Sequence, residues 1–231
     1  MSDLRVALVS EGPTDTIVIE AALKALLPRP FVMTVLQPEP TRPALGSGWG
    51  GVLRWCLEFS ARGVAGFEMD PLLPGFDLYI VHADADVAGD TYSAVSPEIE
   101  KRAIAAGWPI LPSGATCPPA STGADVVRAC LIAWTGIPAL GPKSVLCVPS
   151  KSTDAWLAAA VLGPSHQAIR SIECHTNVAG QLAALPKQQR IKKSVAGYRA
   201  HSDAVTGAWQ QVRSRCTQAE RFSIEVAAVF P

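Results

Sequence analysis

The chain has 231 residues, of which 48% are apolar, and its formal net charge is zero. This composition excludes a disordered protein and suffices for one large domain, or for one domain with a helical appendage. No apolar run approaches the ~18 residues that a membrane-spanning helix needs, and the first five residues lack the basic start and long apolar region of a signal peptide, so we expect a cytoplasmic protein without a membrane partner.

Strands and helices are predicted to alternate along most of the chain. Apolar, partly β-branched runs predict strands at 4–10, 31–36, 76–82 and 143–148. Apolar positions at helical spacing predict helices at 14–27, 52–63, 97–106, 124–135 and 153–162. The Pro- and Gly-rich stretches 38–51 and 110–121 are predicted to be loops. The alternation indicates an α/β fold with a mostly parallel sheet flanked by helices, in Rossmann-like layering.

The last quarter of the chain differs in pattern and in charge. Beyond Gly163 and Pro164 the pattern is more polar and mostly helical, with one short strand predicted at 168–173. Residues 1–165 hold 11 Lys and Arg against 16 Asp and Glu, whereas residues 166–231 hold 9 against 4. We therefore predict an α/β domain over 1–165 and a basic, mainly helical extension over 166–231 packed on it. An acidic part that attracts cations and a basic tail that holds phosphates would explain the asymmetry, and so would chance drift.

The cysteines are scattered and form no close pair. They are Cys56, Cys117, Cys130, Cys147, Cys174 and Cys216. Without a C-x-x-C spacing, a structural zinc site is disfavoured. We expect free structural thiols in a reducing cytosol rather than a disulfide framework.

Acidic residues follow two of the predicted strands. Glu11 and Asp15 come after the first apolar run, and Asp84 and Asp86 come after the third. In an open α/β sheet ligands collect at the carboxyl ends of the strands, so both clusters are expected at the same edge. One acid in such a place is explained as a turn or a helix N-cap, but paired acids after two strands are harder to explain as caps alone.

A further acid, Asp154, follows the predicted strand 143–148. Carboxylates from three strand ends could together hold two Mg²⁺ ions, with Mn²⁺ as an alternative, because these ions prefer oxygen ligands. For Asp15 and Asp154 a simpler explanation is a favourable interaction with a helix dipole, contributing ~0.3–1 kcal/mol.

The order of these motifs resembles the TOPRIM domain, which topoisomerases, primases and the OLD-type (overcoming lysogenization defect) nucleases share. An apolar strand leads into Glu-Gly-x-x-Asp at Glu11–Asp15, and a later one leads into Asp-x-Asp at Asp84–Asp86. The segment Val9–Asp15 is most similar to the OLD-type and stand-alone bacterial versions. The resemblance covers about 4–162 and implies a TOPRIM-like fold, a divalent metal cofactor and metal ligands at Glu11, Asp15, Asp84, Asp86 and Asp154.

The sequence also departs from the family pattern. The segment between the two motifs is long, and Val87 rather than glycine follows Asp86. No G-x-x-x-x-G-K-[ST] loop occurs, so an ATPase or sensor function would have to come from a partner protein. These departures leave the metal site predicted and the substrate open.

Basic and aromatic residues supply further candidates. Lys151 could neutralise a phosphate near the metals as a catalytic group, or it could be an ordinary solvated lysine. His82 could act as a general base or as a hydrogen-bonded structural residue. A nucleic-acid contact, with the tyrosine stacking on a base, is predicted for Lys187, Arg190, Lys192, Lys193 and Tyr198. The alternative for that stretch is a solvated basic helix face.

The resulting hypothesis is a Mg²⁺-dependent phosphodiesterase that cuts or nicks DNA or RNA by two-metal hydrolysis. Its predicted catalytic residues are Glu11, Asp84, Asp86 and Lys151. The TOPRIM resemblance suggests a role in defence against phage. Two alternatives stay open: a metal-dependent phosphatase or nucleotide-sugar transferase that uses Asp-x-Asp, and a non-catalytic binding subunit of a larger complex.

Overall fold

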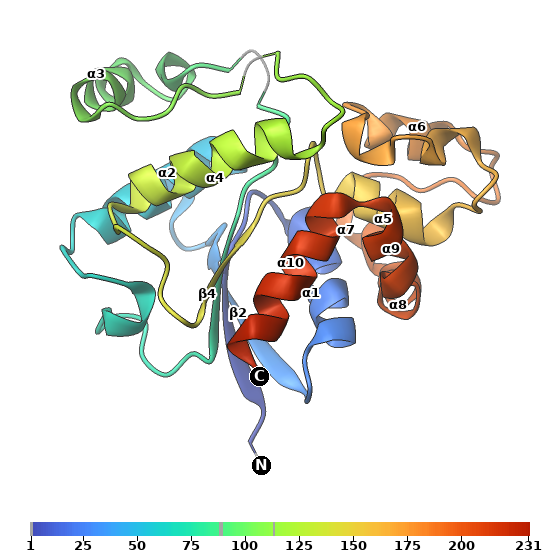
Figure 1. The fold of residues 1–231 in the computed structure, drawn as a ribbon, viewed down its shortest axis with the longest axis horizontal. Coiled ribbons are helices and arrows are strands. Elements are labelled where there is room, and N and C mark those ends of the chain that lie inside the picture. Colours follow the sequence, from blue (N-terminus) through green and yellow to red (C-terminus); the bar gives the residue numbers. More distant parts are fainter. Residues whose placement is uncertain (1, 88–89, 113) are drawn as a thin grey trace.

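A four-stranded, all-parallel sheet lies at the centre of the protein (Figure 1). The structure, a computed structural model, describes residues 2–87, 90–112 and 114–231. The strand order is β2-β1-β3-β4. The strands are β1 (Leu4–Val9), β2 (Phe31–Gln37), β3 (Leu78–His82) and β4 (Ser144–Cys147). This architecture confirms the α/β fold class expected from the alternation of strand and helix patterns.

The burial of each strand follows from its place in the sheet. All residues of β3 and β4 are buried, as expected for parallel strands covered by helices on both faces. Edge strand β2 instead alternates between half-buried and exposed residues over most of its length. This exposure pattern shows that the helices cover β2 only in part.

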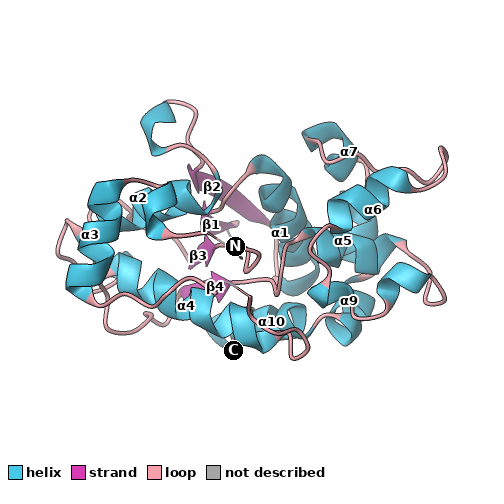
Figure 2. Ribbon diagram, turned by 90° about the horizontal axis from the view of Figure 1, so that it is seen from above, coloured by secondary structure: helices cyan, strands magenta, loops and turns pink. Residues whose placement is uncertain are grey.

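Helices cover both faces of the sheet, as the view from above shows (Figure 2). The helices of the first part are α1 (Pro13–Leu26), α2 (Gly48–Ser60), α3 (Pro97–Ala106), α4 (Ser121–Thr135) and α5 (Asp154–Val161). Those of the last part are α6 (Val178–Ala184), α7 (Val195–Arg199), α8 (Ser202–Gly207), α9 (Trp209–Arg215) and α10 (Thr217–Val229). Side chains of α2 and α4 form the core on one face, and side chains of α1, α5 and α8–α10 form it on the other. Within the described residues, no helix combines the length and apolar character that crossing a membrane requires.

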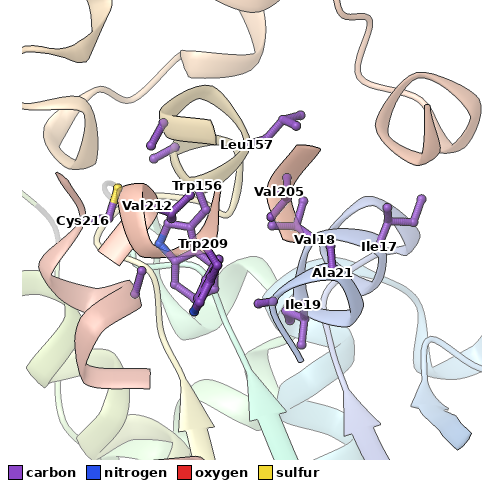
Figure 3. Close-up of a cluster of buried hydrophobic side chains, with 14 of the residues drawn as sticks. Ile17, Val18, Ile19, Ala21, Trp156, Leu157, Val205, Trp209, Val212 and Cys216 are labelled. Atoms are coloured by element: carbon purple, nitrogen blue, oxygen red, sulfur yellow. The ribbon is translucent and has the colours of Figure 1, made fainter. Parts of the chain in front are cut away.

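The core on the second face is continuous across residue 165 (Figure 3). Trp156 of α5 is fully buried, with Trp209 of α9 at 5.5 Å and Phe222 of α10 at 5.8 Å between ring centroids. Val205 of α8 belongs to the same cluster as Val18 of α1. The mainly helical C-terminal part therefore packs directly on the sheet layer through shared apolar contacts.

One predicted loop is partly helical. Helix α2 begins at Gly48 rather than at Val52, inside the glycine-rich stretch that was predicted to be irregular. Gly51 allows a close approach, because a Cβ there would lie 2.7 Å from Nε2 of Gln37. The Gly48 amide also donates a 2.9 Å hydrogen bond to the carbonyl of Glu11. Tertiary contacts with β1 and β2 thus outweigh the poor helix propensity of glycine.

The short strand predicted at 168–173 is wrong. Two short 3₁₀ turns, Gln167–Ile169 and Ile172–Cys174, occupy this region. Ser171 between them has φ of 53°, in the left-handed region, which interrupts any extended run. Apolar Ile172 is buried against the core from a turn rather than from a strand.

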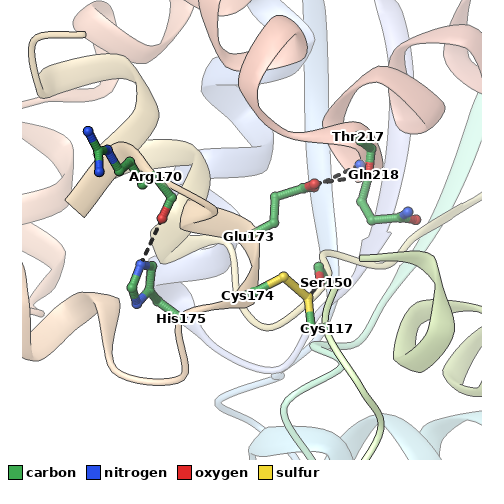
Figure 4. Close-up of a disulfide and its surroundings, with 8 residues drawn as sticks. All are labelled: Cys117, Ser150, Arg170, Glu173, Cys174, His175, Thr217 and Gln218. Carbon is green, nitrogen blue, oxygen red and sulfur yellow. Dashed lines mark hydrogen bonds between the residues drawn. A yellow bond between two sulfur atoms is a disulfide. The ribbon is translucent and has the colours of Figure 1, made fainter. Parts of the chain in front are cut away.

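The expectation that all cysteines are free thiols is also wrong, because Cys117 and Cys174 form a disulfide (Figure 4). The bond joins the loop before α4 to the turn that follows α5, across 57 residues of sequence. Packing of the C-terminal part brings the two Cα atoms to 5.4 Å, a disulfide distance that sequence spacing could not indicate. The other cysteines are free and buried: Cys56, Cys130, Cys147 and Cys216.

We predict that Trp156→Ala lowers the free energy of unfolding by about 3–5 kcal/mol, the usual loss for a large aromatic residue removed from a core. A single urea transition, followed by far-UV circular dichroism, should show the loss. Ile104→Ala is the matched control, since Ile104 is exposed and its truncation should change stability by less than about 0.5 kcal/mol. Separate transitions for the two parts of the chain would contradict the shared core.

Candidate metal centre

The two acidic clusters meet at the carboxyl edge of the sheet. Strands β1 and β3 are parallel neighbours, and Val9 is paired with Val81 near their ends. Residues that follow these two strands therefore emerge side by side. The Asp84 amide donates a 2.8 Å hydrogen bond to Oε1 of Glu11, which joins one cluster to the other.

Asp15 completes the cluster from the first turn of α1. Potential ligand atoms of Asp15, His82 and Asp84 all lie within 4.8 Å of one another, and all three residues are buried. Gly12 leaves room for this arrangement, because a Cβ there would lie only 3.3 Å from Oδ2 of Asp15. Potential oxygen and imidazole ligands thus converge from α1 and from the end of β3.

Thr153 and His82 hold the carboxylates in place. The Thr153 hydroxyl donates to Oδ1 of Asp15 at 2.6 Å, and the Thr153 amide donates to Oδ1 of Asp84 at 3.3 Å. Nε2 of His82 lies 3.1 Å from the same Asp84 oxygen, within hydrogen-bond distance. His82 is wholly buried, so it serves at least as a structural partner of Asp84.

Burial and repulsion between acids raise the pKa of Glu11 and of Asp84. The pKa of Glu11 lies well above its usual value, first because burial disfavours the charged form and then because Asp84 is negatively charged. The pKa of Asp84 is also raised, by burial and then by the charges of Asp15 and Asp86. The cluster therefore concentrates negative charge that a bound cation would stabilise.

Asp154 connects the C-terminal part to this edge. Its Oδ1 accepts a 2.5 Å hydrogen bond from the Tyr198 hydroxyl, and its Oδ2 accepts a 3.0 Å bond from Nζ of Lys193. Burial alone would lower the pKa of Lys193, but the charge of Asp154, followed by those of Asp15 and Asp84, raises it. Lys193 thus stays protonated beside the cluster, and Asp154 acts in this structure as its anchor.

Asp86 lies at the rim of the cluster. Its side chain is exposed, unlike that of Asp84 two residues earlier. Partial desolvation is still the first cause that raises its pKa, and the charges of Asp154 and Asp15 add to it while Lys193 opposes them. Asp86 is therefore close enough to the buried acids to interact with them electrostatically.

The five residues predicted to bind nucleic acid differ in their exposure and in their contacts. Lys187, Arg190 and Lys192 are exposed, and Lys193, which is also exposed, forms an ion pair with Asp154. The role predicted for Tyr198 is wrong, because its ring is only 1% exposed and cannot stack on a base. The local sequence does not indicate that Tyr198 is buried, because its hydrogen-bond partner, Asp154, lies 44 residues away.

Lys151 is buried in the loop between β4 and α5, with 7% of its surface exposed. Within the described residues, no hydrogen bond or ion pair holds its ammonium group. This placement, three residues before Asp154, keeps Lys151 near the acidic edge, and its catalytic role stays a prediction.

Thr153 is the site residue that the sequence did not reveal. A threonine before a helix is typical of an N-cap, and Thr153 does stand at the N-cap position of α5. Its side chain makes no cap hydrogen bond there and contacts Asp15 instead. Nothing in the local sequence distinguishes this contact from an ordinary cap.

The donor set fits a divalent cation. Carboxylate oxygens are the ligands that Mg²⁺ and Mn²⁺ prefer, and the acids Glu11, Asp15 and Asp84 outnumber the ammonium group of Lys193 beside them. Comparisons with protein-family models, with curated proteins and with solved structures each find no match to this chain. The geometry of the site is thus the main ground for assigning a function.

We predict that Asp84→Asn raises the melting temperature at pH 8 in the presence of a chelator. The folded-state pKa of Asp84 lies above the unfolded value of ~3.9, so ionisation of Asp84 costs stability at neutral pH and that cost fades as the pH falls towards 4. The stabilisation by the variant should therefore shrink between pH 8 and pH 4.

Differential scanning fluorimetry across this pH range measures the effect. Asp3→Asn, which removes an exposed carboxylate before β1, is the control and should leave the melting temperature unchanged. Adding Mg²⁺ at pH 8 should stabilise the wild-type protein more than Asp84→Asn. A variant that is less stable than wild type in chelator at every pH would contradict the repulsion argument.

Proposed function

We propose that this protein is a Mg²⁺-dependent phosphodiesterase that cleaves DNA or RNA, with Mn²⁺ as a substitute ion. The observation that carries the proposal is the buried cluster of Asp15 and Asp84, to which a hydrogen bond joins Glu11, with the Lys193 ammonium beside it. The motif order that resembles TOPRIM nucleases supports the same chemistry. When bound, two such ions would activate a water molecule and offset the charge that develops on the scissile phosphate.

The chain's own residues would position and balance these charges. Glu11, Asp15 and Asp84 would supply ligands from the cluster, and Asp86 and Asp154 are further carboxylates within electrostatic reach. Hydrogen bonds from Thr153 would keep two carboxylates oriented towards a common point.

Lys193 would have a role separate from that of the ligands. Its ammonium group, fixed by Asp154 and kept charged by the cluster, would offset the negative charge of a phosphate brought to the site. Lys151, the other lysine near this edge, would be a second catalytic cation.

The excess of positive charge in the C-terminal part favours a nucleic acid as the substrate. Residues 166–231 carry 9 basic against 4 acidic residues, and Lys187, Arg190 and Lys192 are exposed on this part. Such a surface attracts a phosphate backbone without reading its sequence. A phosphodiester in DNA or RNA is therefore a better substrate candidate than a small phosphate ester.

The biological setting is proposed from the sequence, with the role in phage defence suggested by the TOPRIM resemblance. It comprises defence against phage, a partner protein with ATPase or sensor function, and a cytoplasmic location. The Cys117–Cys174 disulfide bears on the last point, because such bonds are rare in a reducing cytosol. The cytoplasmic location stays a prediction that thiol labelling of the protein in cells can test.

Cleavage of supercoiled plasmid and of single-stranded DNA and RNA should require Mg²⁺ or Mn²⁺ and stop in chelator. Asp84→Asn and Glu11→Gln should each lower the rate by roughly 100-fold or more, since even groups that only support metal ligands contribute up to that factor. Asp3→Asn is the matched control and should retain full activity.

The same assay separates the alternatives. Turnover of a chromogenic phosphate monoester without nucleic-acid cleavage would assign a phosphatase and overturn the proposal. Calorimetric binding of Mn²⁺ that Asp84→Asn abolishes, with no turnover of either substrate, would favour a non-catalytic binding subunit. Cleavage that persists in chelator would overturn metal dependence.

Neutralising the exposed basic residues should flatten the salt dependence of nucleic-acid binding. In the Asp84→Asn background, where cleavage does not disturb the signal, Lys187→Gln, Arg190→Gln and Lys192→Gln together should reduce the salt slope by up to about three phosphate contacts. Fluorescence anisotropy on a labelled oligonucleotide at several salt concentrations measures this slope. The control is Lys101→Gln, which changes an exposed lysine on α3 and should leave the salt slope as it is in the parent protein. If the triple variant also keeps the parent slope, its three basic residues belong to a solvated surface that does not contact phosphates.

A further inference from the structure

Strand β2 forms an open edge of the sheet. It pairs with β1 on one side, and the sheet order places no strand on its other side. Within the described residues, no hydrogen bond from outside the β1 ladder reaches Phe31–Leu36. Figure 2 shows β2 at one margin of the sheet and β4 at the opposite one. A row of backbone donors and acceptors along β2 is therefore free to pair.

The opposite edge of the sheet, formed by β4, is covered. Helix α10 packs against β4, and the Arg128 side chain donates a 2.9 Å hydrogen bond to the carbonyl of Leu146 in β4. Arg128 is in turn fixed by an ion pair with Glu225 of α10. The fold thus covers one edge of its sheet with a helix and a side chain and leaves the other uncovered.

Apart from a register shift that leaves Leu36 outside the ladder with β1, β2 has few of the features that keep natural sheet edges apart. Its seven residues, Phe31–Gln37, include neither a charged residue nor a proline. Val32 is 57% exposed, although it lies in the middle of an apolar run. An uncharged, mostly apolar strand with one unpaired edge is expected to pair with another strand along that edge.

A groove with a mixed polar and apolar lining runs along the same edge. A hollow of about 610 Å³ between α1 and β2 is lined by apolar Leu23, Leu27, Phe31 and Met33 and by charged Glu20, Lys24, Arg29 and Arg199, among others. A second hollow of about 580 Å³ shares Val35 with it, so the two lie along one side of the strand. A further strand added to β2 would place its side chains over this groove.

We propose that β2 of a second copy of this chain occupies the edge, in an antiparallel pair about a two-fold axis at Thr34. A two-fold axis makes the interface self-complementary, because the same strand contributes both sides. Val32 then lies opposite Leu36 of the second copy, and Met33 lies opposite Val35. These four apolar side chains meet in pairs, Phe31 lies opposite Gln37, and two four-stranded sheets become one of eight strands.

Charges at the two ends of β2 support this register. Arg29 lies five residues before Thr34, and Glu39 lies five residues after it. The same register, continued two residues beyond each end of the strand, would bring Arg29 of each copy towards Glu39 of the other. Within the described chain neither residue has an ion-pair partner within 4.0 Å; Arg29 donates a hydrogen bond to the Ser2 carbonyl and Glu39 accepts one from the Thr41 hydroxyl.

The proposal does not depend on the proposed function. The acidic cluster lies beyond the carboxyl ends of β1 and β3, whereas the interface lies along β2. Loss of the dimer and loss of metal-dependent cleavage can therefore be observed separately.

Sedimentation equilibrium of the full chain tests the dimer. Wild-type protein should show a concentration-dependent monomer–dimer equilibrium. Val32→Lys should raise the dissociation constant by roughly ten- to hundredfold, because the change enters the interface twice. Ile224→Lys, at a position on α10 with a similar exposure of 59%, is the matched control and should leave the constant unchanged.

A charge exchange tests the register. Arg29→Glu should weaken the dimer by roughly three- to thirtyfold, since two symmetric pairs are lost, and adding Glu39→Arg should restore it to within about threefold. Hydrogen exchange should show amides of Phe31–Gln37 that gain protection as the protein concentration rises. Circular dichroism of each variant confirms that the fold is intact.

Three results would overturn the proposal. One is a wild-type chain that stays monomeric at about 100 µM, well above the dissociation constants typical of stable homodimers, which would leave the edge to a partner of another sequence. The second is a dimer that Val32→Lys does not weaken. The third is a double charge variant no tighter than Arg29→Glu alone.

Discussion

The hydrogen bond from the Asp84 amide to the Glu11 carboxylate joins the ends of two neighbouring strands, and the rest of the acidic edge is arranged around it. A carboxylate that accepts a backbone amide is fixed in position, and it brings its negative charge close to Asp84. The parallel pairing of β1 with β3 makes this contact unavoidable, because both chains leave the sheet on the same side. Repulsion between the acids is thus a direct result of the sheet topology.

The C-terminal part supplies the opposing charge. Asp154 at the start of α5 binds Lys193 and Tyr198, which lie on either side of Ser194 at the start of α7. The buried cluster around Trp156 holds α9 and α10 against the same helix. Packing of the C-terminal helices therefore determines where a positive charge stands relative to the carboxylates, so the core and the site depend on one another.

The disulfide and the network around it reinforce the same junction. Cys174 is linked to Cys117, whose sulfur lies 3.6 Å from the Ser150 hydroxyl at the start of the β4–α5 loop (Figure 4). The adjacent Glu173 carboxylate accepts hydrogen bonds from the first residues of α10, Thr217 and Gln218. One short turn thus ties the loop that carries Lys151 to the helix that closes the β4 edge.

The sequence by itself determined the parallel α/β fold, because apolar runs and helical stripes alternate over the first 165 residues and each marks its own element. It also determined that Glu11 and Asp84 follow strands, which sufficed to predict an acidic cluster at one edge. Only the tertiary structure showed which strands are neighbours and that Asp15 and Asp84 share Thr153.

Tertiary packing also decided the residues for which local pattern was misleading. Tyr198 and Lys193 were similar members of a basic stretch in sequence, yet one is buried and the other stands beside the acids. Cys117 and Cys174 had no spacing to pair them. In each case the partner lies 39 or more residues away, and a contact of that kind arises from the packing of helices, which local propensity does not encode.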